Sequence, residues 1–82
     1  MRTLKKSEIL KHIDSNQYVI RVNTFSWSIR LVKLNEGRDE YTGLLLPDEV
    51  IGAVRYDTYL KLKLEKLNKG YNFNYFIIKG EK

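Results

Sequence analysis

The chain has 82 residues, no cysteine and a formal net charge of +5 at pH 7. Its length predicts one small domain over residues 1–82. The lack of cysteine excludes disulfides, thiolate nucleophiles and cysteine-ligated zinc, and it favours a reducing, cytoplasmic location. The longest apolar runs have three or four residues, far fewer than the ~20 of a transmembrane helix. We therefore expect a soluble protein with no membrane partner.

The first predicted element is a short N-terminal helix. Apolar residues recur at helical spacing between Ile9 and Ile13, and Thr3 or Ser7 can serve as the N-cap. The polar residues 14–16 are typical of a turn. The helix is therefore expected to end before that turn.

Two alternating segments predict a β-hairpin. Residues 17–22 place Tyr18, Ile20 and Val22 on one face of a strand. Residues 25–31 alternate apolar and polar side chains, and the two polar residues between the segments suit a tight turn. The apolar residues of the second strand are expected to face the core, and they are Phe25, Trp27, Ile29 and Leu31.

A third strand is predicted over residues 41–46, after a polar turn. Residues 47–49 then favour a helix start, because proline is tolerated in the first turn and carboxylates are favourable at that end of the helix dipole. From Val50 to Leu67 apolar residues recur at helical spacing, which predicts one longer helix, or two helices broken near Gly52 or Asp57. Gly70 would be the C-terminal cap.

The segment from Tyr59 to Leu67 nevertheless stays open between helix and strand. Leucine and lysine alternate with a period of two from Leu60 to Leu64, and residues 68–70 would suit a hairpin turn. The helix is favoured because Leu67 breaks the alternation and fits the helical spacing.

The C-terminal residues 71–78 are aromatic and β-branched and predict a last strand. The expected fold is a small single α+β domain. It is an antiparallel β-meander of three to four strands, with one short N-terminal helix and one longer helix packed on one face. Such a sheet has open edges, so a homodimer through a sheet edge is a further expectation.

Residues able to carry catalysis or hold a metal are sparse. His12 is the only histidine, and neither Ser26 nor Ser28 stands in a nucleophile-elbow pattern. The carboxylate pairs at 39–40 and 48–49 lack the alternating oxygen spacing of a calcium loop. The glycines are isolated, which excludes a Walker or dinucleotide-binding loop. We expect no catalytic residue, no metal and no cofactor, and hence no enzyme.

Charge is distributed unevenly along the chain. Between Glu36 and Glu49, five acids and one arginine give a net charge of −4, so the remainder carries +9. A basic protein suits an anionic partner. The first functional hypothesis is therefore a non-catalytic module that binds nucleic acid or a nucleoprotein through a basic face. The residues predicted for that face are Arg55, Lys61, Lys63, Lys66, Lys69, Arg30 and Lys33.

The last strand adds aromatic side chains to this hypothesis. Tyr71, Phe73 and Tyr75 share one strand face, and aromatic rings beside positive charge bind single-stranded nucleic acid. The competing interpretation, which is favoured, places these rings in the core against the longer helix.

The alternative hypothesis is a small inhibitor or adaptor, of the type carried by phages and mobile elements, that binds and blocks a partner protein such as an enzyme. An anti-restriction or anti-CRISPR-like role is one example. The motivation is an acidic loop together with tyrosines, because tyrosine is enriched where interfaces concentrate their energy. The predicted interface residues are Glu36, Asp39, Glu40, Tyr41, Tyr56 and Tyr59.

Overall fold

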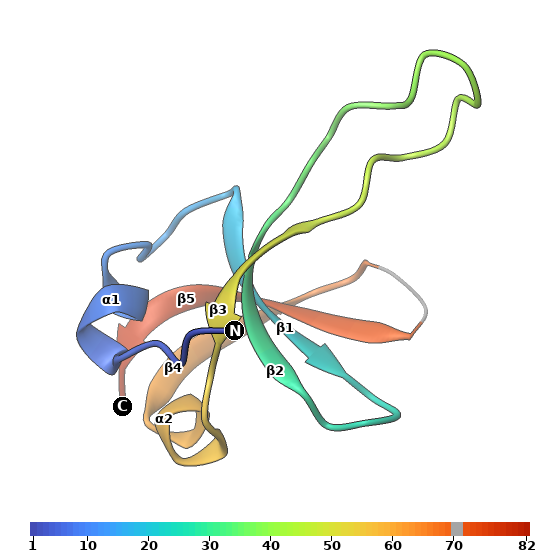
Figure 1. The fold of residues 1–82 in the computed structure, drawn as a ribbon. Helices are drawn as coiled ribbons and strands as arrows, with labels where there is room; N and C mark the ends of the chain where they lie inside the picture. The colour runs from blue at the N-terminus through green and yellow to red at the C-terminus, as the bar shows by residue number, and fades with distance from the viewer. Residues whose placement is uncertain (70–71) are drawn as a thin grey trace.

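A computed structural model describes residues 1–69 and 72–82 (Figure 1). In that part of the chain, five strands form one antiparallel sheet in the order β3-β2-β1-β5-β4, and there are two helices of five residues each. The elements in chain order are α1 (Lys6–Leu10), β1 (Tyr18–Asn23), β2 (Ile29–Lys33), β3 (Glu49–Ala53), α2 (Tyr56–Leu60), β4 (Leu62–Leu67) and β5 (Phe73–Glu81).

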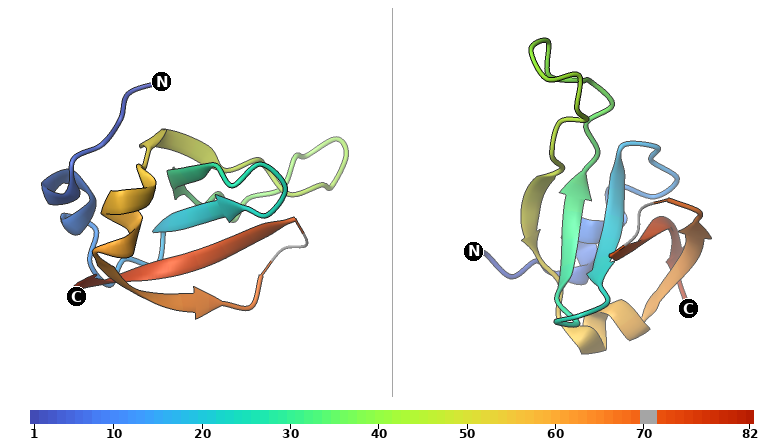
Figure 2. Two further views of the ribbon diagram at one scale, coloured as in Figure 1. Left: turned by 90° about the horizontal axis from the view of Figure 1, so that it is seen from below. Right: turned by 90° about the vertical axis from the view of Figure 1, so that its right-hand side faces the viewer.

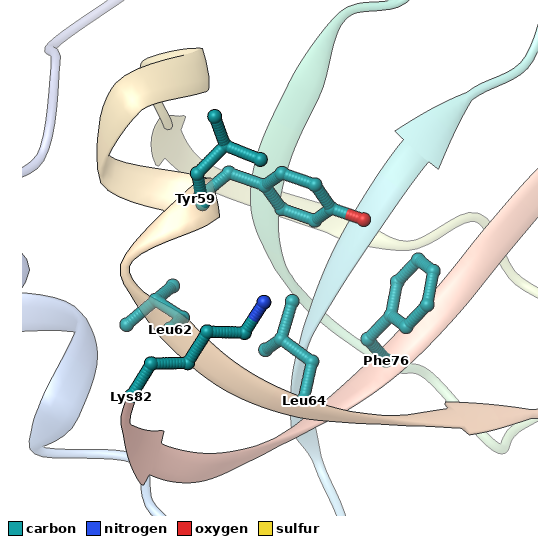
Figure 3. Close-up of a pocket in the computed structure, with 6 residues that line it drawn as sticks. Tyr59, Leu62, Leu64, Phe76 and Lys82 are labelled. Carbon is teal, nitrogen blue, oxygen red and sulfur yellow. The ribbon is translucent and has the colours of Figure 1, made fainter.

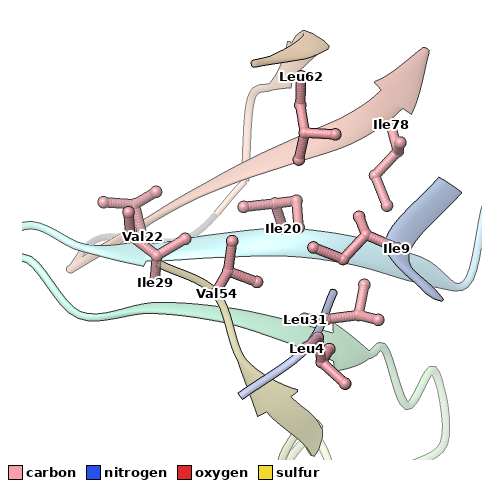
Figure 4. Close-up of a cluster of buried hydrophobic side chains, with 9 residues drawn as sticks. All are labelled: Leu4, Ile9, Ile20, Val22, Ile29, Leu31, Val54, Leu62 and Ile78. Atoms are coloured by element: carbon pink, nitrogen blue, oxygen red, sulfur yellow. The ribbon is translucent and has the colours of Figure 1, made fainter. Parts of the chain in front are cut away.

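One face of the sheet encloses the main hydrophobic core (Figure 4). Leu31 of β2 and Leu62 of β4 belong to the same buried cluster, although β1 and β5 lie between their strands in the sheet. The sheet is therefore strongly curved around this cluster (Figure 4). Both helices pack on this face, α1 through Ile9 and α2 through Tyr59. Truncating a fully buried residue such as Ile20 to alanine would cost about 2–5 kcal/mol.

The opposite face of the sheet carries a smaller apolar cluster. Val19, Val32, Leu34 and Tyr75 are buried there, and Phe73 packs against them. Because this cluster and the main core lie on opposite faces, β1 is buried on both sides. Val19 and its neighbour Ile20 are accordingly both fully shielded from solvent.

The segment of residues 2–4 runs along the free edge of β3. The Leu4 amide donates to the Ala53 carbonyl and the Ala53 amide donates to the Arg2 carbonyl, both at 2.8 Å. A Cβ atom at Gly52 would lie 2.7 Å from Cγ of Leu4. Glycine is therefore required at this position to let the segment approach β3.

The prediction of an α+β fold with one longer helix is wrong, and the error lies in residues 50–67. Residues 50–67 contain the end of β3, the five-residue α2 and β4, so the strand interpretation is confirmed for Leu62–Leu67. Partner strands decide the outcome, since β3 pairs with β2 and β4 pairs with β5 along its length. The predicted helix start at residues 47–49 is wrong for the same reason, because Glu49 already belongs to β3.

Two predicted strands are also corrected. β2 begins at Ile29, and residues 24–28 form the turn, so Phe25 and Trp27 are exposed rather than buried while Ile29 and Leu31 do face the core. Residues 41–46 form no strand of the sheet and lie in the long connection between β2 and β3. The inward face of β1 is as predicted, with Tyr18, Ile20 and Val22 on the main core.

The predicted terminal elements are closer to the observed ones. The short N-terminal helix is present as α1, but its N-cap is Lys5, whose amide donates to the Glu8 carboxylate at 3.1 Å. The last strand is present as β5, displaced to Phe73–Glu81. Gly70, the predicted helix cap, and Tyr71, predicted to share a strand face with Phe73 and Tyr75, lie outside the described residues. Across the described ranges, no helix is long and apolar enough to cross a membrane.

Candidate functional site

The connection between β2 and β3 folds into a projecting arm, which we call the finger (residues 35–47). The Asp39 amide donates to the Leu44 carbonyl at 2.8 Å, and the Leu46 amide donates to the Gly37 carbonyl at 3.0 Å. Arg38 and Leu45 form an isolated antiparallel bridge between the two arms of the finger. The finger extends well beyond the sheet (Figures 1 and 2). It is therefore a two-stranded arm with its own hydrogen bonds.

The tip of the finger is fixed by Asp39. Its Oδ1 accepts hydrogen bonds from the amides of Tyr41 at 2.9 Å and Thr42 at 3.0 Å. These bonds favour the ionised form, with the Thr42 amide first and the Tyr41 amide second, so the pKa of Asp39 is lowered. Gly43 closes the turn with a φ of 71°, and its carbonyl accepts a bond from Arg38 Nη1 at 2.9 Å. The tip is thus held in one conformation.

Large apolar side chains on the finger remain in solvent. Tyr41 is 89% exposed and Leu44 is 69% exposed, while Leu45 and Leu46 are partly turned back toward the base. The acids Glu36, Asp39 and Glu40 accompany them, and Arg38 is the only base between residues 36 and 46, which gives a local charge of −2. The combination of an apolar centre with a polar rim is typical of a protein interface.

The base of the finger is anchored on the outer face of the sheet by Asp48. The Tyr75 hydroxyl donates to Asp48 Oδ2 at 2.7 Å, and Arg21 Nη1 lies 3.6 Å from the same oxygen. Burial is the main cause that raises the pKa of Tyr75 to about 12, and the hydrogen bond to Asp48 and its negative charge add to the effect. The Arg21 guanidinium also lies over the Phe73 ring, 4.6 Å from its centroid.

A hollow of about 530 Å³ lies between the base of the finger and this outer face. Leu45, Leu46 and Pro47 line it from the finger, and Phe73 and Tyr75 line it from β5. Phe73 and Tyr75 thus share one face, as predicted, but they pack beneath the finger and on the face opposite to both helices. Tyr75 is only 7% exposed and is therefore a packing residue.

The predicted protein-interface residues divide between two places. Glu36, Asp39, Glu40 and Tyr41 all lie on the finger. Tyr56 and Tyr59 lie on α2, at the other end of the sheet (Figure 2). The six residues therefore do not form one surface. An interface made of the four finger residues stays a prediction. Leu44 is not among the predicted interface residues, because the sequence pattern predicts a strand of the sheet over residues 41–46.

The other end of the sheet carries exposed rings, which we call the aromatic end (Phe25, Trp27 and Tyr56). Phe25 is 79% exposed, Trp27 is 73% exposed and Tyr56 is 63% exposed. Trp27 and Tyr56 line a hollow of about 400 Å³. The Tyr56 ring stacks on Tyr59, with centroids 6.2 Å apart. Trp27 has a positive φ of 57°, which is unusual for a bulky residue.

The predicted basic residues do not form one continuous face. Lys61 ends α2, while Lys63 and Lys66 are three apart in β4 and so point to opposite faces of the sheet. Lys69 follows β4, with its ammonium 5.9 Å from the Tyr75 ring, and Lys33 lies at the same distance from the Tyr18 ring. The structure does bring two of the predicted residues close to the aromatic end. They are Arg30, paired with Ala53, and Arg55, which precedes α2.

A further small hollow of about 280 Å³ lies between α2 and the β4–β5 hairpin (Figure 3). Tyr59 and Phe76 line it and meet in a T-shaped, edge-to-face contact, with centroids 6.1 Å apart. Burial raises the pKa of Tyr59, and the neighbouring Tyr56 adds to this shift. Leu62 and Leu64 complete the wall, so this hollow is an extension of the core surface under α2.

The few residues with catalytic potential have structural roles. His12 stacks on the Tyr18 ring at 4.2 Å, and the Ser26 and Ser28 hydroxyls bond to each other at 3.0 Å. Within residues 1–69 and 72–82, no three histidine or acidic side chains gather as metal ligands would. The expectation of a protein without catalytic activity or cofactor stays a prediction.

Comparisons with known proteins add no relative. No family model matches the chain, and neither a curated protein nor a solved structure is similar to it. The chemistry of the finger and of the aromatic end is therefore the basis on which a function can be proposed.

Proposed function

We propose that this protein is a non-catalytic inhibitor or adaptor that docks on a partner protein through the finger. The observation that carries the proposal is an ordered, acidic arm that holds Tyr41 and Leu44 in solvent. The partner surface that fits it is a basic groove with an apolar pocket, because positive charge would complement the −2 of residues 36–46.

The apolar side chains supply the expected binding energy. Tyr41 and Leu44 lie at the tip, where they are too far from the main core to be buried by folding. Burying apolar surface is worth roughly 25 cal/mol per Å², so both side chains gain most when a partner covers them. Tyrosine is also over-represented among residues that dominate binding energy.

The shape of the finger lowers the cost of docking. Hydrogen bonds within the tip and the bridge between Arg38 and Leu45 already fix the backbone. At the base, Asn35 Nδ2 donates to the Pro47 carbonyl at 2.6 Å. A preordered loop loses less conformational entropy on binding than a flexible one. The acidic rim would further increase the rate of encounter with a basic partner.

The test compares three forms of the chain as baits in host lysate treated with nuclease. They are the wild type, the double variant Tyr41→Ala/Leu44→Ala and the control Phe25→Ala, whose exposed ring lies at the opposite end. We expect one stoichiometric partner with the wild type and the control but not with the double variant. The purified partner is then titrated calorimetrically with each form. Equal affinity for the wild type and the double variant would rule out the finger as the docking site.

A further inference from the structure

We propose that the aromatic end is a second binding site, in which Trp27 and Tyr56 stack on an unpaired base of single-stranded nucleic acid. This site is separate from the finger, and its two stacking rings, Trp27 and Tyr56, are not among the residues of the basic-face hypothesis. It is argued from the conformation of Trp27, the support of Tyr56 and the charge around both rings.

The backbone holds Trp27 in an unfavourable conformation. A φ of 57° places it in the left-handed region, which costs non-glycine residues roughly 1–2 kcal/mol. Burial of the ring does not offset this cost, since Trp27 is 73% exposed. Strained residues that persist at the surface are a recognised sign of a functional site.

The turn that carries Trp27 is well ordered. Asn23 Oδ1 accepts hydrogen bonds from the amides of Phe25 at 2.9 Å and Ser26 at 3.2 Å. The Trp27 amide donates to the Asn23 carbonyl at 2.8 Å. The indole is therefore presented to solvent by a fixed turn, which reduces the entropy lost when a ring stacks on it.

Tyr56 is supported from behind by other rings. It stacks on Tyr59 with an interplanar angle of 23°, and Tyr59 meets Phe76 in an edge-to-face contact. Trp27 and Tyr56 line an open hollow of about 400 Å³ at the surface. A planar base that enters this hollow would contact both aromatic side chains.

The charge around the rings favours a polyanion. The Val54 amide donates to the Ile29 carbonyl at 2.9 Å, so the chain segments that carry the two rings are adjacent. These segments carry Arg30, Arg55 and Lys61 against Asp57, a charge of +2 counted along the sequence. Arg30 projects to the sheet face opposite Ile29 and Leu31, and its Nη1 donates to the Ile29 carbonyl at 2.9 Å. Arg55 lies 3.6 Å from Asp57, but its side chain is 71% exposed and can reach a phosphate. Aromatic stacking beside phosphate-binding cations is how single strands are bound without sequence readout.

Trp27 is the only tryptophan, so its fluorescence reports directly on the site. The wild type is titrated with oligothymidine and oligouridine single strands and with duplex DNA, at about 50 and 200 mM salt. We expect saturable quenching by the single strands, weaker binding at the higher salt and little quenching by the duplex. The absence of quenching by any single strand at low salt would overturn the proposal, and so would equal quenching by the duplex.

Variants test the two rings separately. In anisotropy measurements with labelled oligothymidine, Trp27→Ala and Tyr56→Ala should each weaken binding about fivefold or more. Tyr56→Phe, which keeps the ring, should stay within about twofold of the wild type. The matched control is Tyr41→Ala on the finger, which should leave affinity unchanged.

Two results would place binding elsewhere and overturn the proposal. One is unchanged affinity in both Trp27→Ala and Tyr56→Ala. The other is loss of binding in the triple variant Lys61→Ser/Lys63→Ser/Lys66→Ser while Trp27→Ala binds normally, because that result would assign the site to the lysines. A finger variant that loses its protein partner but still quenches with single strands would support two independent sites.

Discussion

The finger and the aromatic end lie at opposite ends of the sheet (Figure 2) and differ in chemistry. The finger combines tyrosine and leucine with a local charge of −2, whereas the aromatic end combines tryptophan, tyrosine and phenylalanine with +2. In each region a side-chain oxygen accepts hydrogen bonds from two backbone amides. The acceptor is Asp39 in the finger and Asn23 in the turn that carries Trp27. The net charge of +5 for the whole chain therefore does not describe either exposed surface, since their local charges have opposite signs.

The largest expected effect concerns the finger. The double variant Tyr41→Ala/Leu44→Ala should lower affinity for the protein partner about 100-fold or more, since dominant interface residues each contribute ~2 kcal/mol or more. The stability of the free protein should change by less than about 0.5 kcal/mol, because both side chains are exposed. Calorimetric titration and denaturant unfolding measure the two quantities. A large loss of stability would mean that the finger packs on the domain instead of presenting a surface.

The anchor of the finger should have the next largest effect. Asp48→Ala leaves the Tyr75 hydroxyl without its acceptor and Arg21 without its carboxylate, so stability should fall by about 1–3 kcal/mol. Urea unfolding measures this loss, and hydrogen exchange of the finger amides should accelerate. Glu36→Ala, an exposed acid on the same connection, is the matched control and should change stability little. If both variants unfold alike, Asp48 does not anchor the finger.

At the aromatic end, the backbone strain at Trp27 predicts a smaller effect on stability, in which a glycine variant is more stable than an alanine variant. Trp27→Gly should be more stable than Trp27→Ala by about 0.5–1 kcal/mol, because relief of the left-handed conformation exceeds the backbone entropy that glycine loses. Both variants should lose oligothymidine binding. Paired thermal unfolding curves measure the difference, and an alanine variant of equal or greater stability would show that the backbone carries no strain there.

The smallest effect is a shift in a tyrosine titration. The pKa of Tyr75 is raised from its ordinary value of 10.0 to about 12, so its contribution to stability is complete below pH 10 and is lost as the pH rises through about 12. Ultraviolet titration of the phenols should show a component near pH 12 that disappears in Tyr75→Phe. A Tyr75→Phe titration identical to that of the wild type would contradict the burial of this hydroxyl beside Asp48.

The sequence predicted best where local periodicity and burial agree. Tyr18, Ile20 and Val22 face the main core as their spacing indicates, and β5 forms where aromatic and β-branched residues gather. Periodicity was misleading at Trp27, because the alternation of apolar and polar residues in β2 extends back into the turn that precedes it. No local sequence pattern indicates that strand pairing begins only at Ile29.

The helix expected over residues 50–67 failed for a different reason. Its leucines fit a period of 3.6 and a period of two, and only pairing with β5, distant in sequence, favours the strand at Leu62–Leu67. The acidic residues of the candidate site were found because they are neighbours in sequence. Leu44 was missed because three successive leucines favour a buried strand, and nothing in the local sequence indicates that they lie in an exposed arm.

The segment of residues 2–4 has a consequence for self-association. It occupies the edge of β3, and its Leu4 side chain is only 3% exposed within the main core. A second copy could add its strand at that edge only by expelling Leu4, which would open the core. At the other edge, the charged side chains Lys63, Glu65 and Lys66 of β4 oppose pairing with a further strand. Strand addition along the whole of β3 would therefore compete with the docking of residues 2–4 at Ala53, whereas addition at β4 is opposed by charge.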